Sequence, residues 1–551
     1  MMFFTLFSLA FADIPAGSTI EGAGLIDVPP EGFSSISTLL PALIPQTIPV
    51  ASTTGGGEAL SCSYDYGIDN IWVSVSVNTA SITPQNGYLS LDIGLLVSIN
   101  EISDQFALDF AVSNCGFLNA ESTCSGYVTT FPATVQARID LVLLDPDGDG
   151  VKELDASINN VSVDYSAVNA NNFEINCLVG SILNALNWIG FDMYSFVLDL
   201  VRPILENEIN NQLPELETTI EEAFANASID QEFAIGESMM QIVLSPEDID
   251  ILPDGLRLSF DGMTAIRDAS SCIIDYDTGA SKETPGTPNA IGDLAVPADV
   301  GITIRDEFIN QALYSVWRAG ALCQTIDENT FALDSSILQL LTGNVFEEII
   351  PESKPMEIRI DPVQPPTLDM TSTSDVGVSV EDLRLNFFTE IDERTVMALS
   401  VSLETTAGLD LVFDPNLGTL EGDIALDPNE ITTSIVQNEF RPQDDQIIID
   451  NFAVQFGSVL DLVGLESLLS ALNFQLPSVN GVGVTQVELA GTGSTSSDLG
   501  SHLSLGPVPY TGGCSSQGSS GCTTVQHAHN QGKGLLAFMV VVLGYLRRRA
   551  K

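Results

Sequence analysis

The sequence predicts an α+β protein made of two halves, each combining a few long apolar helices with many amphipathic strands. Three observations lead to this prediction. Apolar and polar residues alternate with a period of two over long stretches. In each half this alternation gives way to apolar residues at three- and four-residue steps. A polar, Pro-rich segment separates the two halves. With 551 residues the chain is too long for one ordinary hydrophobic core.

Strand-like alternation marks most of the first half. Residues 13–60 are rich in Pro and Gly, and we interpret them as an N-terminal extension. Alternation then runs from Ile71 to Val97, from Val135 to Leu144, and from Ile242 to Leu258. A period of two places the apolar side chains on one face of a strand, so we expect half-buried strands in a first domain over 61–274.

Helical spacing appears in three places. Apolar residues recur every three or four positions over Phe196–Leu213, Arg305–Leu322 and Val459–Leu472, which predicts long amphipathic helices. Residues 275–298 have no apolar period and read as a linker. A second domain over 299–507 follows, with alternating strands between Met356 and Phe413. The helices need an apolar partner, for which the inward face of a curved sheet is suited.

The charge is strongly negative. The chain carries 74 Asp and Glu against 18 Lys and Arg, a net charge of −56, and five of the 18 basic residues lie within 533–551. Nucleic-acid binding needs clustered Lys and Arg, so we expect no nucleic-acid partner. Capture of a strongly anionic head group by a basic patch is disfavoured for the same reason. The surplus of acid is typical of a solvated surface.

The two ends of the chain carry targeting signals. Residues 1–12 form a short apolar run that closes on Ala10-Phe11-Ala12, which predicts a signal peptide and a secreted protein. Residues 508–533 form a Gly/Ser-rich stalk, and 534–551 combine a short apolar helix with an Arg cluster. The apolar run is shorter than the roughly 20 residues that a comfortable membrane span requires.

This tail resembles the sorting tails of myxobacterial surface proteins, the MYXO-CTERM type. The resemblance rests on Gly521-Cys522, the spacer, the short apolar helix and the Arg cluster. It implies processing near a cysteine, for which Cys522 or Cys514 would serve, and display on the outer surface of a bacterial envelope. A simple single-span membrane anchor is the alternative.

Six cysteines lie in the body of the chain: Cys62, Cys115, Cys124, Cys177, Cys272 and Cys323. An even number in an exported chain predicts disulfides. No C-x-x-C motif supports a zinc ribbon or a thioredoxin-like redox site. Cys115 with Cys124 is the simplest local pair, and Cys272 with Cys323 would bracket the predicted domain junction.

The segment Val300–Gly320 resembles the start of the C-terminal domain in the bactericidal/permeability-increasing protein family. That family includes lipopolysaccharide-binding protein and cholesteryl ester transfer protein, and it belongs to the tubular lipid-binding superfamily. Pro365-Pro366 and Phe474-Gln475-Leu476-Pro477 agree with it, so the resemblance covers about 298–507. It implies two elongated barrels in tandem, boomerang-like, each a long amphipathic helix wrapped in a highly curved antiparallel sheet.

The resemblance also implies an apolar tube in each barrel that accepts acyl chains. Such a tube binds lipid by burying apolar area, at about 0.8 kcal/mol per CH₂ group. Apolar or zwitterionic lipid suits this chain better than strongly anionic lipid. The alternative is a structural or adhesive surface protein whose barrels are solid. The candidate lining residues are Phe196, Leu200, Phe308, Leu313, Trp317, Leu469 and Leu472.

Catalysis has no support in the residue pattern. The three histidines are His502, His527 and His529, so the body before residue 502 contains none. That argues against Ser-His-Asp and Cys-His catalysis and against most zinc enzymes. We therefore expect a protein that is not an enzyme.

One motif suggests a metal. Residues 145–150, Asp-Pro-Asp-Gly-Asp-Gly, fit the first half of an EF-hand-type Ca²⁺ loop, although Ala156 stands where the bidentate Glu is expected. An acidic hairpin turn is the alternative. Calcium is the one possible cofactor, and its ligands would be Asp145, Asp147, Asp149, Val151 and Glu153.

Overall fold

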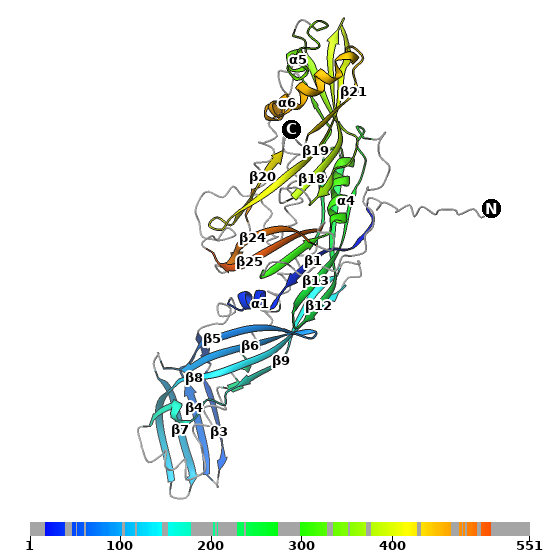
Figure 1. The fold of residues 1–551 in the computed structure, drawn as a ribbon. Helices are drawn as coiled ribbons and strands as arrows, with labels where there is room; N and C mark the ends of the chain where they lie inside the picture. The colour runs from blue at the N-terminus through cyan, green and yellow to red at the C-terminus, as the bar shows by residue number, and fades with distance from the viewer. Residues whose placement is uncertain are drawn as a thin grey trace, which may run out of the picture.

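The computed structural model shows an elongated, mostly β protein with few helices, built from three curved antiparallel sheets that follow one another along the long axis (Figure 1). It describes residues 17–38, 47–177, 229–273, 298–463 and 473–508, together with 202–203, 206–207 and 217. The gaps inside these ranges are 51, 60–61, 102–104, 116–117, 146–151, 236–237, 328–333, 351–352, 371–375, 427–430, 476–477, 480–481 and 493–497.

The N-terminal sheet lies at one end of the molecule. Its order is β2 (Thr47–Val50), β5 (Ile71–Gln85), β6 (Tyr88–Ile99), β8 (Leu118–Leu144), β7 (Phe106–Cys115), β4 (Cys62–Asp69) and β3 (Thr53–Ala59), with β9 (Glu153–Asp164) and β10 (Phe173–Cys177) also paired to β8. The two edge strands β2 and β3 are consecutive in the chain. The strands β6 and β7 pair one after the other with the same side of β8, while β9 and β10 pair with its other side. Strands β2 and β3 therefore lie in line along one edge of the sheet, with Val50 within about 11 Å of Thr53.

The central sheet takes strands from both halves of the sequence (Figure 1). Its order is β11 (Ile229–Ile235), β12 (Ser238–Leu252), β13 (Gly255–Ile266), β1 (Ile20–Val28), β14 (Val300–Ile304), β25 (Asp498–Pro507), β24 (Val482–Thr492) and β23 (Ser478–Val479).

The C-terminal sheet forms the other end of the molecule. Its order is β15 (Gln324–Ile326), β16 (Met356–Pro362), β18 (Val376–Ile391), β19 (Arg394–Asp414), β20 (Thr419–Leu426) and β22 (Asn473–Gln475). In addition, β17 (Thr367–Asp369) pairs with β18 and β21 (Thr432–Gln437) pairs with β19.

The helices cover and connect the sheets. They are α1 (Pro30–Ser37), α4 (Asp306–Arg318), α5 (Ser335–Thr342) and α6 (Asp445–Val463), with 3₁₀ turns η2 (Ala170–Asn172) and η3 (Pro442–Asp444). Helix α4 carries acids in its first turn and Arg318 in its last, which suits the helix dipole, and Gly320 ends it with a φ of +74°. Among the residues that the structure describes, no helix combines the length and the apolar character needed to cross a membrane.

Helix α1 lies between the N-terminal and central sheets (Figure 1). The Ser37 hydroxyl accepts a hydrogen bond from the Ile82 amide of β5 at 2.9 Å, and the Ser35 hydroxyl donates to the Asp299 carboxylate at 2.9 Å. Asp299 precedes β14 and also accepts from the Leu505 amide of β25. This short helix therefore fixes one sheet against the other.

The structure revises the predicted boundaries. Residues 13–60 are not a separate extension, because β1 pairs with β13 on one side and with β14 on the other. For the same reason the chain does not divide at 275–298 into independent halves, since the central sheet joins them. The predicted helix over Arg305–Leu322 forms as α4. The one predicted over Val459–Leu472 begins earlier, at Asp445, and 464–472 lie outside the described residues.

Two hydrophobic cores fill the described residues. The first runs through the N-terminal and central sheets and includes Phe308 of α4. The second lies between the C-terminal sheet and helices α5 and α6. A small cluster of Ile273, Tyr314 and Trp317, with Cys272 and Cys323 against it, forms a third group.

Candidate functional site

One face of the N-terminal sheet is a continuous apolar surface. Burial alternates along β6, so that every second residue from Leu89 to Ile99 belongs to the first core. The strand register then places apolar residues of neighbouring strands opposite one another. One row crosses β5, β6, β8 and β9 through Ala80, Ile93, Val135 and Val163, and a second crosses β5, β6 and β8 through Ile82, Leu91 and Ala137.

The margins of this face are more open than its middle. Ile93 is 7% exposed and Val135 is 3% exposed, whereas Ala80 and Val163 at the ends of the same row are only half-buried. The residues at the margins therefore keep apolar area that further burial would remove from water.

A helical segment contacts the β9 side of the sheet. Five residues of this segment are described, and all five are helical. The Arg202 guanidinium lies 5.6 Å from the ring centre of Tyr165, and the Glu217 carboxylate accepts a hydrogen bond from the Ile158 amide at 2.6 Å. Burial, with Glu206 nearby, raises the pKa of Tyr165 well above its usual range, so its hydroxyl stays neutral.

The sequence gives little indication of these contacts between the helical residues and the sheet. The alternation of Val161 and Val163 would have extended the strand pattern to β9. The approach of Arg202 to Tyr165 depends on how the helical segment folds back on the sheet, and no local pattern predicts that.

The predicted lining residues fall into two groups. Phe196, Leu200, Leu469 and Leu472 lie outside the described residues. Phe308 and Trp317 of α4 are 1% and 2% exposed, so both side chains are fully buried, whereas Leu313 is half-buried. The expectation that Phe308 and Trp317 line a lipid tube thus finds no support.

Both side chains have specific protein partners instead. A Cβ added at Gly262 of β13 would lie 2.7 Å from the Phe308 ring, so the ring rests directly on the sheet backbone. The Trp317 indole donates a hydrogen bond to the Pro362 carbonyl at 2.8 Å. These contacts are those of packed core residues.

An acidic cluster lies at the start of α4. Carboxylate oxygens of Asp306, Glu307 and Asp498 lie within 4.8 Å of one another. Asp498 accepts a hydrogen bond from the Asp306 amide, and Arg305 pairs with Glu307. Burial, with Asp306 nearby, raises the pKa of Glu307. The cluster therefore has a structural task at the helix N-terminus, where negative charge is favourable.

A second acidic feature is a hollow of about 530 Å³ at the end of the N-terminal sheet. Its three acidic residues lie on β4, β7 and β8, on the outward-facing side of the sheet, and Gly67 and Ala111 lie between them. Thr123 donates to Asp109 at 2.7 Å. The three acids of this hollow are Asp65, Asp109 and Glu121.

The structure confirms one predicted disulfide and contradicts another. Cys272 and Cys323 are bonded, with a Cα–Cα distance of 6.6 Å. Cys115 lies opposite Leu118 and Cys124 opposite Leu108, so the two cysteines are about 20 Å apart along the hairpin, beyond a disulfide's reach. Cys124 is nevertheless disulfide-bonded, and Cys177 lies directly opposite it on β10. The side chain of Cys62 is outside the described part.

The predicted calcium loop joins two antiparallel strands. Leu144 at the end of β8 pairs with Glu153 at the start of β9, and Asp145 begins the connection. Asp147, Asp149 and Val151 lie outside the described residues, as do Cys514, Cys522 and the rest of the C-terminal tail. The calcium site and the processing of the tail both stay predictions.

The described residues thus combine curved antiparallel sheets, one apolar sheet face and helical residues against it. The structure is similar to the crystal structure of a lipopolysaccharide binding protein, with a TM-score of 0.50 and 14% sequence identity over 89% of this chain and 100% of that chain. This likeness shows the fold. It agrees with the family that the segment Val300–Gly320 resembles.

Other solved structures are more distant. P47 of Clostridium botulinum E1 gives a TM-score of 0.29 at 8% identity, covering 89% of this chain and 100% of that chain. Takeout 1 of Epiphyas postvittana gives 0.22 at 9% identity, covering 34% and 90%. Neither supports an argument. No protein-family model matches the sequence, and no curated protein matches it.

Proposed function

We propose that the protein binds or transfers lipid and holds acyl chains against the apolar face of the N-terminal sheet. The observation that carries this proposal is the pair of apolar cross-strand rows on that face, in a fold shared with a lipopolysaccharide binding protein. We further propose that the curved sheets work as two tubes in tandem and that the protein is not an enzyme.

The ligand we propose is an apolar or zwitterionic lipid. Each buried CH₂ group contributes about 0.8 kcal/mol to binding, so an apolar face needs no charged partner to hold an acyl chain. A strongly anionic head group would meet a chain with 74 acidic and 18 basic residues. Electrostatic repulsion therefore disfavours such a lipid, lipopolysaccharide included.

The site of action we propose is the outer surface of the cell. The signal-like N-terminus supports export, and the sorting-type tail supports attachment to the envelope, with the Gly/Ser stalk between the tail and the carrier body. Surface proteolysis of intact cells tests this proposal. Release of the body by external protease supports it, and full protection of the body contradicts it.

Lipid binding is tested first on the purified protein. Native mass spectrometry should show co-purified lipid, and a fluorescent fatty acid should bind. Val163→Lys places a charge on the half-buried margin of the apolar face and should weaken fatty-acid binding tenfold or more. Ser162→Lys is the matched control, because the neighbouring residue on β9 is exposed on the opposite face.

The competing function is a structural or adhesive surface protein with solid barrels. The tight packing of Phe308 and Trp317 favours solidity in the region around α4. Three results together would support the structural function and reject lipid binding. The purified protein would carry no lipid, it would take up no fluorescent fatty acid, and Val163→Lys and Ser162→Lys would behave alike.

A further inference from the structure

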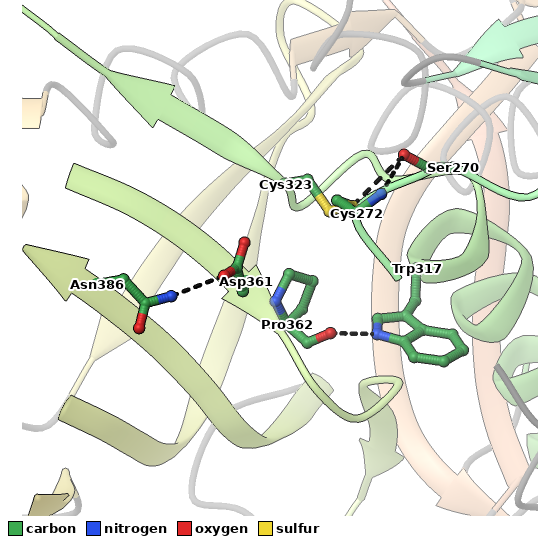
Figure 2. The surroundings of a disulfide bond; sticks show 7 residues. All are labelled: Ser270, Cys272, Trp317, Cys323, Asp361, Pro362 and Asn386. Atoms are coloured by element: carbon green, nitrogen blue, oxygen red, sulfur yellow. Dashed lines mark hydrogen bonds between the residues drawn. A yellow bond between two sulfur atoms is a disulfide. The ribbon is translucent and has the colours of Figure 1, made fainter. Parts of the chain in front are cut away.

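The small cluster between the two hydrophobic cores is a joint. Ile273, Tyr314 and Trp317 form it, and Cys272 and Cys323 pack against them. Cys272 lies in the turn after β13 of the central sheet, and Cys323 lies directly before β15 of the C-terminal sheet. The disulfide therefore links a residue that follows the central sheet to one that begins the C-terminal sheet (Figure 2).

Hydrogen bonds from α4 cross the same joint. Trp317 donates to the Pro362 carbonyl, and the Asn310 side chain accepts from the Leu368 amide of β17 at 2.6 Å. Next to Pro362, the Asp361 carboxylate accepts from Asn386 of β18 at 2.6 Å (Figure 2). The end of β16 is thus held by α4 on one side and by its own sheet on the other.

The turn that carries Cys272 is seated on the end of α4. The Ser270 amide donates to the Arg318 carbonyl at 2.9 Å. A Cβ added at Gly320 would lie 2.4 Å from the Ser270 side chain and 3.4 Å from Cys272 Sγ. Only glycine permits this close approach, so the fold brings the turn and the helix end together independently of the disulfide.

We propose that the Cys272–Cys323 disulfide is a redox latch that seats the C-terminal sheet on α4 and the central sheet. Both cysteines are only half-buried, which leaves the bond within reach of a thiol. Neither belongs to the main body of either core, so opening the bond loosens the joint and leaves both cores folded. The latch goes beyond lipid binding and does not depend on it.

The reductant is a dithiol. One thiolate attacks a sulfur of the bond and forms a mixed disulfide, and the second thiol displaces the protein sulfur. Two electrons and two protons pass to the protein, which ends with two free thiols, and the reductant ends as a disulfide.

Hydrogen exchange tests the latch on the whole protein. We compare the wild type, the wild type treated with dithiothreitol, and the double variant C272S/C323S. The amides of Leu368 and Ser270 should exchange at least tenfold faster in the treated wild type and in the double variant. Tryptophan fluorescence should shift to longer wavelength in both, because Trp317 becomes more exposed to solvent. Exchange in β6 of the first core and β19 of the second should change less than twofold.

Cys124→Ser is the matched control, since it removes a different disulfide that dithiothreitol also opens. This variant should leave the exchange of Leu368 and Ser270 unchanged. Unchanged exchange at both amides in C272S/C323S would overturn the latch. Faster exchange throughout β6 and β19 would overturn it as well, because the bond would then support the whole fold.

Discussion

Truncating Phe308 to Ala separates the two roles that this ring can have. The ring is 1% exposed and lies on the backbone of Gly262, so its removal leaves a closed cavity between α4 and the central sheet. Replacing a buried Phe by Ala costs about 3–5 kcal/mol when the surroundings cannot collapse. A β-sheet backbone cannot move into the space, so we expect a loss of free energy of unfolding in the upper part of that range.

The measurement is a urea titration followed by far-ultraviolet circular dichroism. Hydrogen exchange of the β13 amides assigns the transition to the first core. Leu313→Ala is the control on the same helix, because Leu313 is half-buried and should lose less. Gly262→Ala should itself cost about 1–3 kcal/mol, because its new methyl group would meet both the Phe308 ring and Ala23 Cβ. The cost should be smaller in the Phe308→Ala background, where only the contact with Ala23 remains.

A ring that bordered a lipid tube would behave differently. Its truncation would only widen a space that already exists, and it would change the lipid that the protein retains. A loss below about 1 kcal/mol together with altered lipid content would therefore refute a packed core around α4.

Two further predictions concern the C-terminal unit and the metal. Asp334 caps α5 by accepting from Ser336, and hydrogen bonds from Ser336 and Ser353 lower its pKa. Asp334→Ala should cost about 1 kcal/mol at neutral pH, by thermal melting, whereas Asp334→Asn keeps the cap. Because the folded pKa is the lower one, the charged cap stabilises above about pH 4 and the difference between wild type and Ala variant should shrink as pH falls below it. Calorimetric titration with Ca²⁺ should release or absorb heat with the wild type and not with Asp147→Ala; heat in neither, or equal heat in both, removes the calcium loop.

Much of the local structure was predictable. The alternation from Ile71 to Val97 became β5 and β6, and the stripe beginning at Arg305 became α4, whose end at Gly320 needs a positive φ. The pairing of Cys272 with Cys323, one of several that six cysteines allow, was predicted from its position at the domain junction and is confirmed. The local pair of Cys115 with Cys124 failed because closeness in sequence says nothing about which residues of a hairpin face each other.

The sequence predicted that the candidate site is apolar, but not which residues form it. Apolar stripes on helices pointed to burial, but burial does not distinguish a ligand wall from a core. Phe308 lies against Gly262, and Trp317 donates a hydrogen bond to the Pro362 carbonyl. Both partners lie about 45 residues away in the sequence. Local periodicity reports only on neighbouring residues, so it does not predict contacts at this separation.

The sequence by itself determined the strands β5 and β6 and the helix α4, and which face of each is apolar, because side-chain periodicity is a property of neighbouring residues. Only the tertiary structure decided which strands meet. Strand β1 joins β13 and β14 through pairs such as Gly24 with Phe260 and Gly24 with Ile304, and this makes one central sheet of two predicted halves. The physical reason is that strand pairing is a choice among distant partners, set by burial of the whole face and by loop closure, and neither is written in a local pattern.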